Sequence, residues 1–151
     1  MGFNELNSVE HFFIHQLTGV NLNEEKSGFA VEEPVPAYDT VTWRYVHCDL
    51  LKRDITEVLL EKELKESLCR LNPDIERNPE NADEIIRKLR AILITVANVG
   101  LVRANEEFAK WLRNEYSLPF GQKGEHVKIK LIDYKNLKNN SFILTDRKSV
   151  V

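Results

Sequence analysis

The sequence contains few of the residues and patterns that mark several common classes of protein. Its two cysteines, Cys48 and Cys69, are isolated and form no C-x-x-C pair, so we interpret both as reduced structural thiols rather than parts of a disulfide framework or a zinc site. No apolar run approaches the roughly 20 residues of a membrane span, and no charged leader with a cleavage site opens the chain. We therefore expect a cytoplasmic protein with no membrane partner.

Signature motifs of many enzymes are also missing. The chain has no phosphate-binding Walker loop, no G-x-G-x-x-G, no G-x-S-x-G and no Cys and His cluster with zinc-finger spacing. His11 and His15 stand four residues apart, which is the spacing of two metal ligands on one helix face, but the glutamate of the H-E-x-x-H motif is absent. Two ligands do not make a site, so no metal site is predicted.

The remaining composition is typical of a globular domain. Of the 151 residues, 42% are hydrophobic and 30% are charged, with only 6 Gly and 5 Pro. These values predict a single domain over residues 1–151 with a sizeable core.

Charge is distributed unevenly along the chain. The net charge is -3, but the segment from Phe120 onward has seven basic and three acidic residues, a net charge of +4, which leaves -7 for the rest. The basic segment favours contact with a phosphate backbone, and lysines that protect an exposed sheet edge give the same pattern. The candidate DNA-binding residues are Lys128, Lys130, Lys135 and Lys138.

Apolar residues at helical spacing predict three long helices and a short one. The first long helix is capped by Thr56 and stopped by Asn72-Pro73, and the second opens at Asn81 and breaks at Gly100. The third covers residues 101–116, where Asn105 lies on or beside the apolar face and is expected to tie down a neighbouring loop. The short helix, residues 9–17, is expected to bury Phe12, Phe13, Ile14 and Leu17.

Three segments read as strands: residues 40–46, 128–134 and 141–146. The last two are separated by a polar turn and predict a hairpin. The expected fold class is α+β, a helical body packed on a small, incomplete sheet.

A carboxylate followed two residues later by a lysine is the pair that nucleases use on a strand, where both side chains share one face. Glu63-Leu64-Lys65 lies in a predicted helix, where positions two apart diverge. Asp133 and Lys135 are better placed, at the end of a predicted strand, but an acid on a neighbouring strand is not evident.

Several stretches, in order, resemble the N-terminal region of the R (restriction) subunit of type I restriction-modification enzymes. They are Val9-Glu10 with Phe13-Ile14 and Gln16-Leu17, residues 57–60 with Leu68-Cys69-Arg70-Leu71-Asn72-Pro73, Ala104-Asn105-Glu106-Glu107-Phe108, and Leu131-Ile132-Asp133-Tyr134 with Asn139-Asn140-Ser141-Phe142. The resemblance runs over nearly the whole chain.

This resemblance implies a PD-(D/E)XK nuclease domain that cuts DNA with Mg²⁺, in a large ATP-driven motor subunit that works with DNA and with methyltransferase and specificity subunits. In that family the hairpin is followed by a metal-binding Asp in an R-x-D-like sequence and then by E-L-K, and the motor has a phosphate-binding loop. After residues 141–146 this chain contains neither an R-x-D-like sequence nor an apolar strand that ends in E-L-K, and no phosphate-binding loop is present; its Glu63-Leu64-Lys65 lies in a predicted helix. The implied molecule is therefore an N-terminal fragment, catalytically incomplete, with no cofactor of its own.

The resemblance also implies a site role for one residue of this chain. Glu10 matches a position where many nucleases of this fold have a glutamate, although near a helix N-terminus it also favours the helix dipole. Alternatives to the fragment are a non-catalytic module that binds DNA or protein, and an unrelated helical domain. An incomplete sheet exposes an edge, so a homodimer through that edge is a further expectation.

Overall fold

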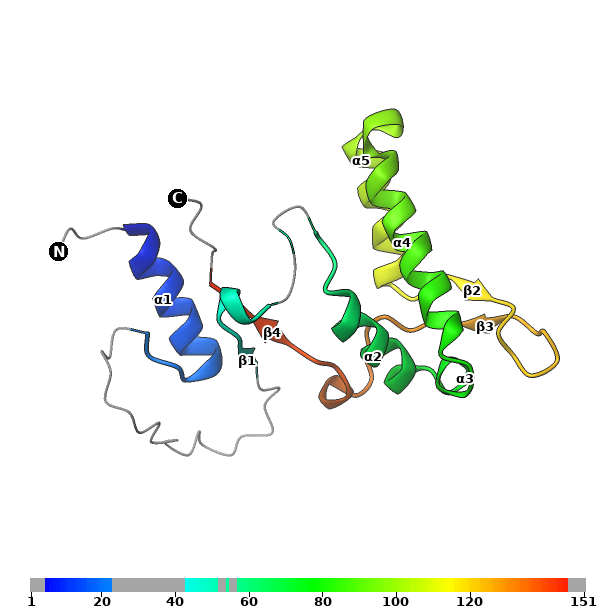
Figure 1. Cartoon of the computed structure of the whole chain (residues 1–151), viewed down its shortest axis with the longest axis horizontal. Coiled ribbons are helices and arrows are strands. Elements are labelled where there is room, and N and C mark those ends of the chain that lie inside the picture. The colour runs from blue at the N-terminus through cyan, green and yellow to red at the C-terminus, as the bar shows by residue number, and fades with distance from the viewer. Residues whose placement is uncertain (1–4, 23–42, 52–53, 55–56, 147–151) are drawn as a thin grey trace. The chain divides into compact units, whose positions relative to one another are not determined.

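The computed structural model describes residues 5–22, 43–51, 54 and 57–146 (Figure 1). The chain divides into two compact units, the first formed by residues 1–54 and 141–151 and the second by residues 55–140. Together they contain helices and short strands, which confirms the α+β class.

The first unit contains one long helix, α1 (Glu5–Thr18), and two short strands, β1 (Arg44–Tyr45) and β4 (Ile143–Leu144). These strands pair in parallel, with Tyr45 opposite Leu144. The rings of Trp43 and Phe142, at the start of each strand, lie 5.0 Å apart between centroids. A single-turn helix, η1 (Cys48–Leu50), follows β1 directly.

The burial of α1 differs from the sequence prediction. Ile14 is buried as expected, but Phe12 and Phe13 are 58% and 56% exposed and Leu17 is also exposed. The expectation of a fully buried apolar face was therefore wrong for three of its four residues. Phe12 and Phe13 lie edge to face instead, with their ring centroids 5.9 Å apart.

The second unit contains four helices, α2 (Glu61–Leu71), α3 (Pro73–Arg77), α4 (Glu80–Val99) and α5 (Leu101–Leu112). The predicted end at Asn72-Pro73 is confirmed, and the same proline opens the unpredicted α3, because proline is well suited to the first turn of a helix. The proposed cap Thr56 lies outside the described residues. Gly100 interrupts the helical path between α4 and α5 as predicted, with φ of 85°.

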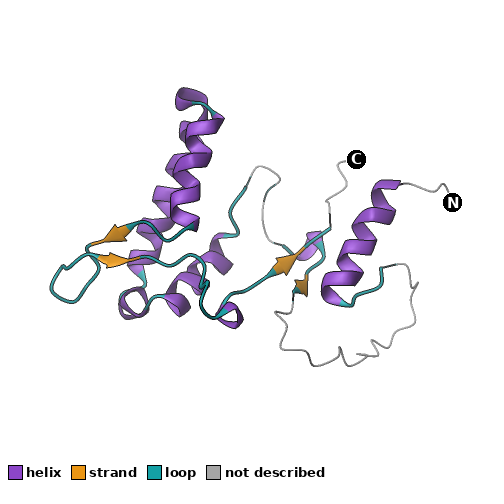
Figure 2. Cartoon of the chain, turned by 180° about the vertical axis from the view of Figure 1, so that it is seen from behind, coloured by secondary structure: helices purple, strands orange, loops and turns teal. Residues whose placement is uncertain are grey.

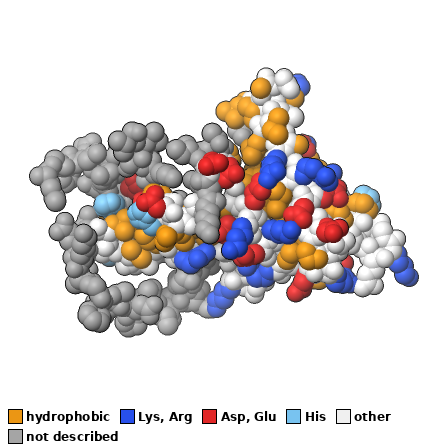
Figure 3. Space-filling model, in the orientation of Figure 1, with side chains coloured by type: hydrophobic (Ala, Val, Ile, Leu, Met, Phe, Trp, Pro, Cys, Tyr) orange, Lys and Arg blue, Asp and Glu red, His pale blue; other side chains and the backbone are white. Residues whose placement is uncertain are grey.

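The core of the second unit lies where α2, α3 and α4 meet the end of α5 and the segment after β3 (Val127–Lys128). Apolar residues three and four apart on α4 supply half of its buried members, as their spacing requires. Its buried members are Leu68, Ile75, Ala82, Ile85, Ile86, Leu89, Trp111 and Ile129. Lys65 on α2 bridges to Asp83 on α4 at 2.7 Å, and Arg90 pairs with Glu61, on a surface where both charges alternate (Figure 3).

The predicted hairpin does not form. Strand β3 pairs antiparallel with β2 (Ser117–Leu118), with Leu118 opposite Val127, while β4 pairs with β1 (Figure 2). The three predicted strands therefore contribute to two separate two-stranded sheets instead of one. Residues 130–133 form no ladder, because asparagine side chains bond to most of their backbone groups.

Helix α5 ends at Leu112, four residues before the predicted Tyr116. Asn114 stops it, since its φ of 57° is left-handed and interrupts the helical path. Asn105, expected on the buried face, is exposed. Over the described residues, none of the helices is both long and apolar enough to cross a membrane.

Candidate functional site

The segment that carries most of the candidate residues is held by three asparagine side chains rather than by a neighbouring strand. Asn72, buried at the end of α2, accepts from the Lys130 N–H at 2.8 Å and donates to the Lys130 carbonyl at 2.9 Å. It also donates to the carbonyl of Leu68 at 2.9 Å. Its amide thus takes the place of a paired peptide group.

Two further asparagines repeat this arrangement along the chain. Asn114 accepts from the Leu131 N–H at 2.9 Å and donates to the Ile132 carbonyl at 2.8 Å. Asn140 accepts from the Asp133 N–H at 2.8 Å and donates to the Asp133 carbonyl at 2.9 Å. We call residues 130–133 the asparagine-held segment. Because most of its backbone N–H and C=O groups are already paired, this segment does not depend on a strand partner.

Asp133, the candidate metal ligand, is largely buried at the start of the following turn, with 9% of its surface exposed. Its Oδ1 accepts from the backbone N–H groups of Lys135 and Asn136, both at 3.0 Å. Its Oδ2 accepts from Asn139 Nδ2 at 2.9 Å. This is the pattern of an aspartate that shapes a turn by bonding to its own backbone.

These donors also explain the acidity of Asp133. The N–H of Asn136 contributes most to lowering the pKa of the carboxyl below its ordinary value, followed by the amide of Asn139 and the N–H of Lys135. The positive charge of Lys130 acts in the same direction. The carboxylate is therefore held ionised by its own turn.

The candidate DNA-binding lysines are all exposed. Lys128 ends β3, Lys130 lies in the asparagine-held segment, and Lys135 and Lys138 lie in the turn that contains η2 (Leu137–Asn139). Arg70 of α2 donates to the Asn139 carbonyl at 3.0 Å and so fastens this turn to the helices. The four lysines are thus displayed along 11 residues of a firmly held chain.

The weak candidate Glu10 lies on α1 in the first unit, whereas Asp133 and Lys135 lie in the second. Glu10 is partly buried, and its charge is one of the smaller contributions that raise the pKa of Tyr45 to about 12; burial of the phenol contributes most. His11 and His15 lie on the same helix, and His15 is exposed. The structure thus assembles no site from Glu10, Asp133 and Lys135 within one unit.

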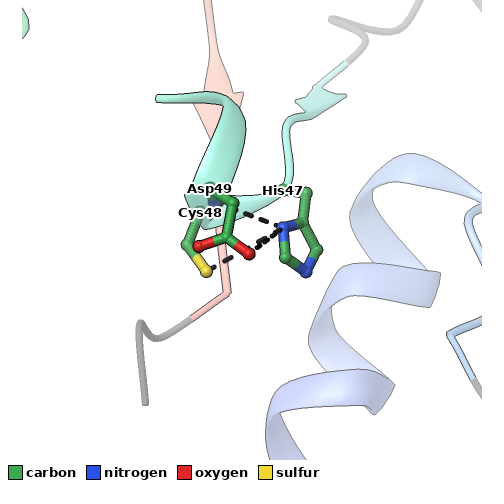
Figure 4. Close-up of side chains that lie close together, drawn as sticks. All are labelled: His47, Cys48 and Asp49. Atoms are coloured by element: carbon green, nitrogen blue, oxygen red, sulfur yellow. Dashed lines mark hydrogen bonds and ion pairs between the residues drawn. The ribbon is translucent and has the colours of Figure 1, made fainter. Parts of the chain in front are cut away.

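A second cluster, which the sequence interpretation missed, follows strand β1. His47, Cys48 and Asp49 place a ring nitrogen, a sulfur and a carboxylate oxygen within 4.8 Å of one another (Figure 4). The parallel pairing of β1 with β4 brings Asp146 to the same place, with Oδ2 3.4 Å from Cys48 Sγ and 3.5 Å from His47 Nε2. Only the run of three potential ligands was visible in the sequence, because the partner comes from 97 residues further on.

Asp146 is the centre of this cluster's hydrogen bonds. Its Oδ1 accepts from the Cys48 N–H at 2.8 Å and from the Tyr45 hydroxyl at 3.1 Å. Burial opposes ionisation of Asp146, but the hydrogen bonds from Cys48 and Tyr45 outweigh it, and the pKa of the carboxyl is lowered. Desolvation, and then the hydrogen bond to Asp146, raise the pKa of the Cys48 thiol.

The residues present do not fit the magnesium site that the family implies. Mg²⁺ takes oxygen ligands, usually carboxylates and waters. Among the described residues, the only group of three or more His, Cys, Asp or Glu side chains close enough to share an ion is His47, Cys48 and Asp49, which contains a thiol and an imidazole. Asp133 stands outside such a group, with both of its oxygens bonded within its own turn.

Residues 26–150 match the family described as the type I restriction enzyme R protein N terminus. No curated protein and no solved structure matches the chain.

Proposed function

This chain belongs to the family formed by the N termini of type I restriction enzyme R proteins, and we propose that it acts as the N-terminal part of a nuclease domain in a DNA-restriction complex. The match over 125 of the 151 residues carries this proposal. The partners are then DNA and the methyltransferase and specificity subunits. Mg²⁺ and ATP belong to the activity of such a complex, and we assign neither to a residue of this chain.

We further propose that these 151 residues do not cleave DNA by themselves. The support is the state of Asp133, whose oxygens accept three hydrogen bonds from Lys135, Asn136 and Asn139. Three of the roughly four lone-pair positions of this carboxylate are already used, so a metal ion would have to take the one left on Oδ2 or displace a hydrogen bond. The role that fits Asp133 is to shape the turn that displays Lys135 and Lys138.

Incubation of the purified chain with supercoiled plasmid and Mg²⁺ tests this second proposal. We expect no more nicking than a heat-inactivated sample gives. The matched variants are Asp133→Asn and Asp83→Asn, the latter removing an exposed carboxylate on α4. Nicking that requires Mg²⁺, is lost in Asp133→Asn and persists in Asp83→Asn would overturn it, provided that circular dichroism shows both variants folded.

A contribution to DNA binding is the second candidate function, and the exposed lysines of residues 128–138 favour it. The four lysines Lys128, Lys130, Lys135 and Lys138 lie on a segment whose backbone is already held in place. When they bind a phosphate backbone, the main loss of conformational entropy is therefore that of the lysine side chains themselves. Each lysine that neutralises a phosphate releases counterions, so affinity should fall steeply with salt.

Fluorescence anisotropy with a labelled duplex tests this role. If Lys130 and Lys135 contact phosphates, the double variant Lys130→Gln/Lys135→Gln lowers the slope of log affinity against log salt by about 2. The control is Lys88→Gln/Lys110→Gln, which removes two lysines that pair with glutamates on their own helices. Equal loss in both double variants, or no binding at low salt, would rule out the role.

A further inference from the structure

The cluster after β1 has the composition of a transition-metal site. Cysteine sulfur, imidazole nitrogen and carboxylate oxygen are the three donor types that zinc takes in proteins, and the thiolate favours zinc over magnesium or calcium. His47, Cys48 and Asp49 supply one of each, from a half-exposed position at the start of η1. We propose that these three side chains bind Zn²⁺ or a chemically similar divalent transition metal.

The distances within the cluster are close to those of a tetrahedral site. With zinc bonds of about 2.0 Å to nitrogen or oxygen and 2.3 Å to sulfur, neighbouring ligand atoms lie about 3.3–3.6 Å apart. Here His47 Nδ1 lies 3.6 Å from Asp49 Oδ2 and 4.0 Å from Cys48 Sγ. The ligand atoms of all three residues lie within 4.8 Å of one another, so the Cys48 sulfur has to move closer to the other two donors, away from Asp146 Oδ2, for the three to share an ion.

The tautomer of His47 suits this role. Its Nδ1 accepts a hydrogen bond from the Asp49 N–H at 3.2 Å, so Nδ1 carries a lone pair and the ring proton of a neutral imidazole lies on Nε2. A metal ion would take that lone pair in place of the weak backbone contact. The atom that faces Cys48 and Asp49 is thus the one able to bind the ion.

Asp146 positions the site from the neighbouring strand. Its Oδ2 lies 3.5 Å from His47 Nε2, and its Oδ1 accepts from the Cys48 N–H at 2.8 Å. A carboxylate behind a metal-binding histidine fixes the ring and strengthens it as a ligand. Since β1 and β4 run in parallel with Tyr45 opposite Leu144, His47 and Asp146 each follow two residues after a paired position.

Metal binding releases one proton to solvent. The Cys48 thiol releases its proton to solvent as the metal–sulfur bond forms, and water fills the fourth position. The proposal is independent of DNA cleavage, because it involves none of the residues of the asparagine-held segment or its turn. All three ligands come from residues 47–49, and the hydrogen bonds of Asp146 connect this metal site to the segment that follows β4.

Titration of the reduced full chain with Co²⁺, followed by displacement with Zn²⁺, tests the proposal. A thiolate-to-cobalt charge-transfer absorption should rise to one equivalent and vanish when Zn²⁺ is added. Cys48→Ser should abolish this absorption, whereas the matched control Cys69→Ser, which removes the other free thiol, should leave it unchanged. His47→Gln should abolish saturable binding, and Asp146→Asn should weaken it about 10–100-fold.

Three results would overturn the proposal. One is the lack of charge-transfer absorption in the wild-type chain. Another is loss of the signal in Cys69→Ser with retention in Cys48→Ser. The third is equal affinity in the wild type, His47→Gln and Asp146→Asn, which would mean that an isolated thiol binds the ion. A rise in the thermal midpoint with Zn²⁺ in every variant except Cys48→Ser and His47→Gln is a second readout that supports the site.

Discussion

At the scale of single residues, Asn72 links the helices to the asparagine-held segment through three hydrogen bonds. We expect Asn72→Ala to lower the free energy of unfolding by about 1–3 kcal/mol, because buried partners lose their hydrogen bonds. Urea denaturation followed by tryptophan fluorescence measures this. Asn105→Ala, an exposed change on α5, is the control and should stay within about 0.5 kcal/mol of wild type. An equal effect of both changes would contradict the linking role.

Asp133 should contribute to a pH dependence of stability. Its pKa is lowered in the folded chain, so its stabilisation is present above the unfolded value of about 3.9 and is lost as pH falls through the lower folded value. The difference in unfolding free energy between wild type and Asp133→Asn should therefore be largest near neutral pH and shrink below about pH 4. Denaturation series at several pH values measure it, and a difference that grows on acidification would contradict this sign.

At the scale of elements, Gly100 separates α4 from α5. Its φ of 85° and ψ of 155° belong to a region that essentially only glycine occupies, and a Cβ added there would meet nothing within 4 Å. Gly100→Ala should therefore cost about 1–3 kcal/mol through backbone strain alone. Thermal or urea unfolding checks it against Asn98→Ala, which lies exposed near the end of α4 and should be neutral or slightly stabilising. A neutral Gly100→Ala would mean that the break adopts another backbone conformation.

The long helices were predictable from the sequence, apart from the end of α5, because their signals are local; the short α3 was not predicted. Asn72-Pro73, the apolar spacing of α4 and Gly100 each act within a few residues of the boundary that they set. The strands were not, since a run of β-forming residues does not say what it pairs with. Residues 128–134 have a strand's composition, yet Asn72 and Asn114, from other parts of the chain, take the hydrogen bonds that a strand would use.

The same limit applies to the candidate site. Lys128, Lys130, Lys135 and Lys138 could be named from charge alone, and the structure places them on one exposed stretch. The hydrogen bonds that Asp133 accepts within its own turn could not be predicted, because the positions of the donor groups depend on how that turn folds. The cluster of His47, Cys48 and Asp49 with Asp146 depends on a parallel pairing between distant strands, which no short pattern reveals.

At the scale of the whole molecule, a homodimer through a sheet edge stays a prediction. Each described strand offers only two residues, so an edge supplies few hydrogen bonds and association should be weak and dependent on concentration. Light scattering over a concentration series measures it. A molar mass that stays at 17.6 kDa at the highest concentrations would count against a dimer.

The central claim for the whole molecule is that this R-protein N terminus contributes a firmly held segment and its lysines, and that Asp133 shapes that segment without binding Mg²⁺. The most direct test is a Mg²⁺ titration of the ¹⁵N-labelled chain, following the backbone amides of Lys135 and Asn136, which donate to Asp133. We predict that both resonances stay in place while the carboxylate keeps its hydrogen bonds. A saturable shift of these two amides, absent in Asp133→Asn, would contradict the claim.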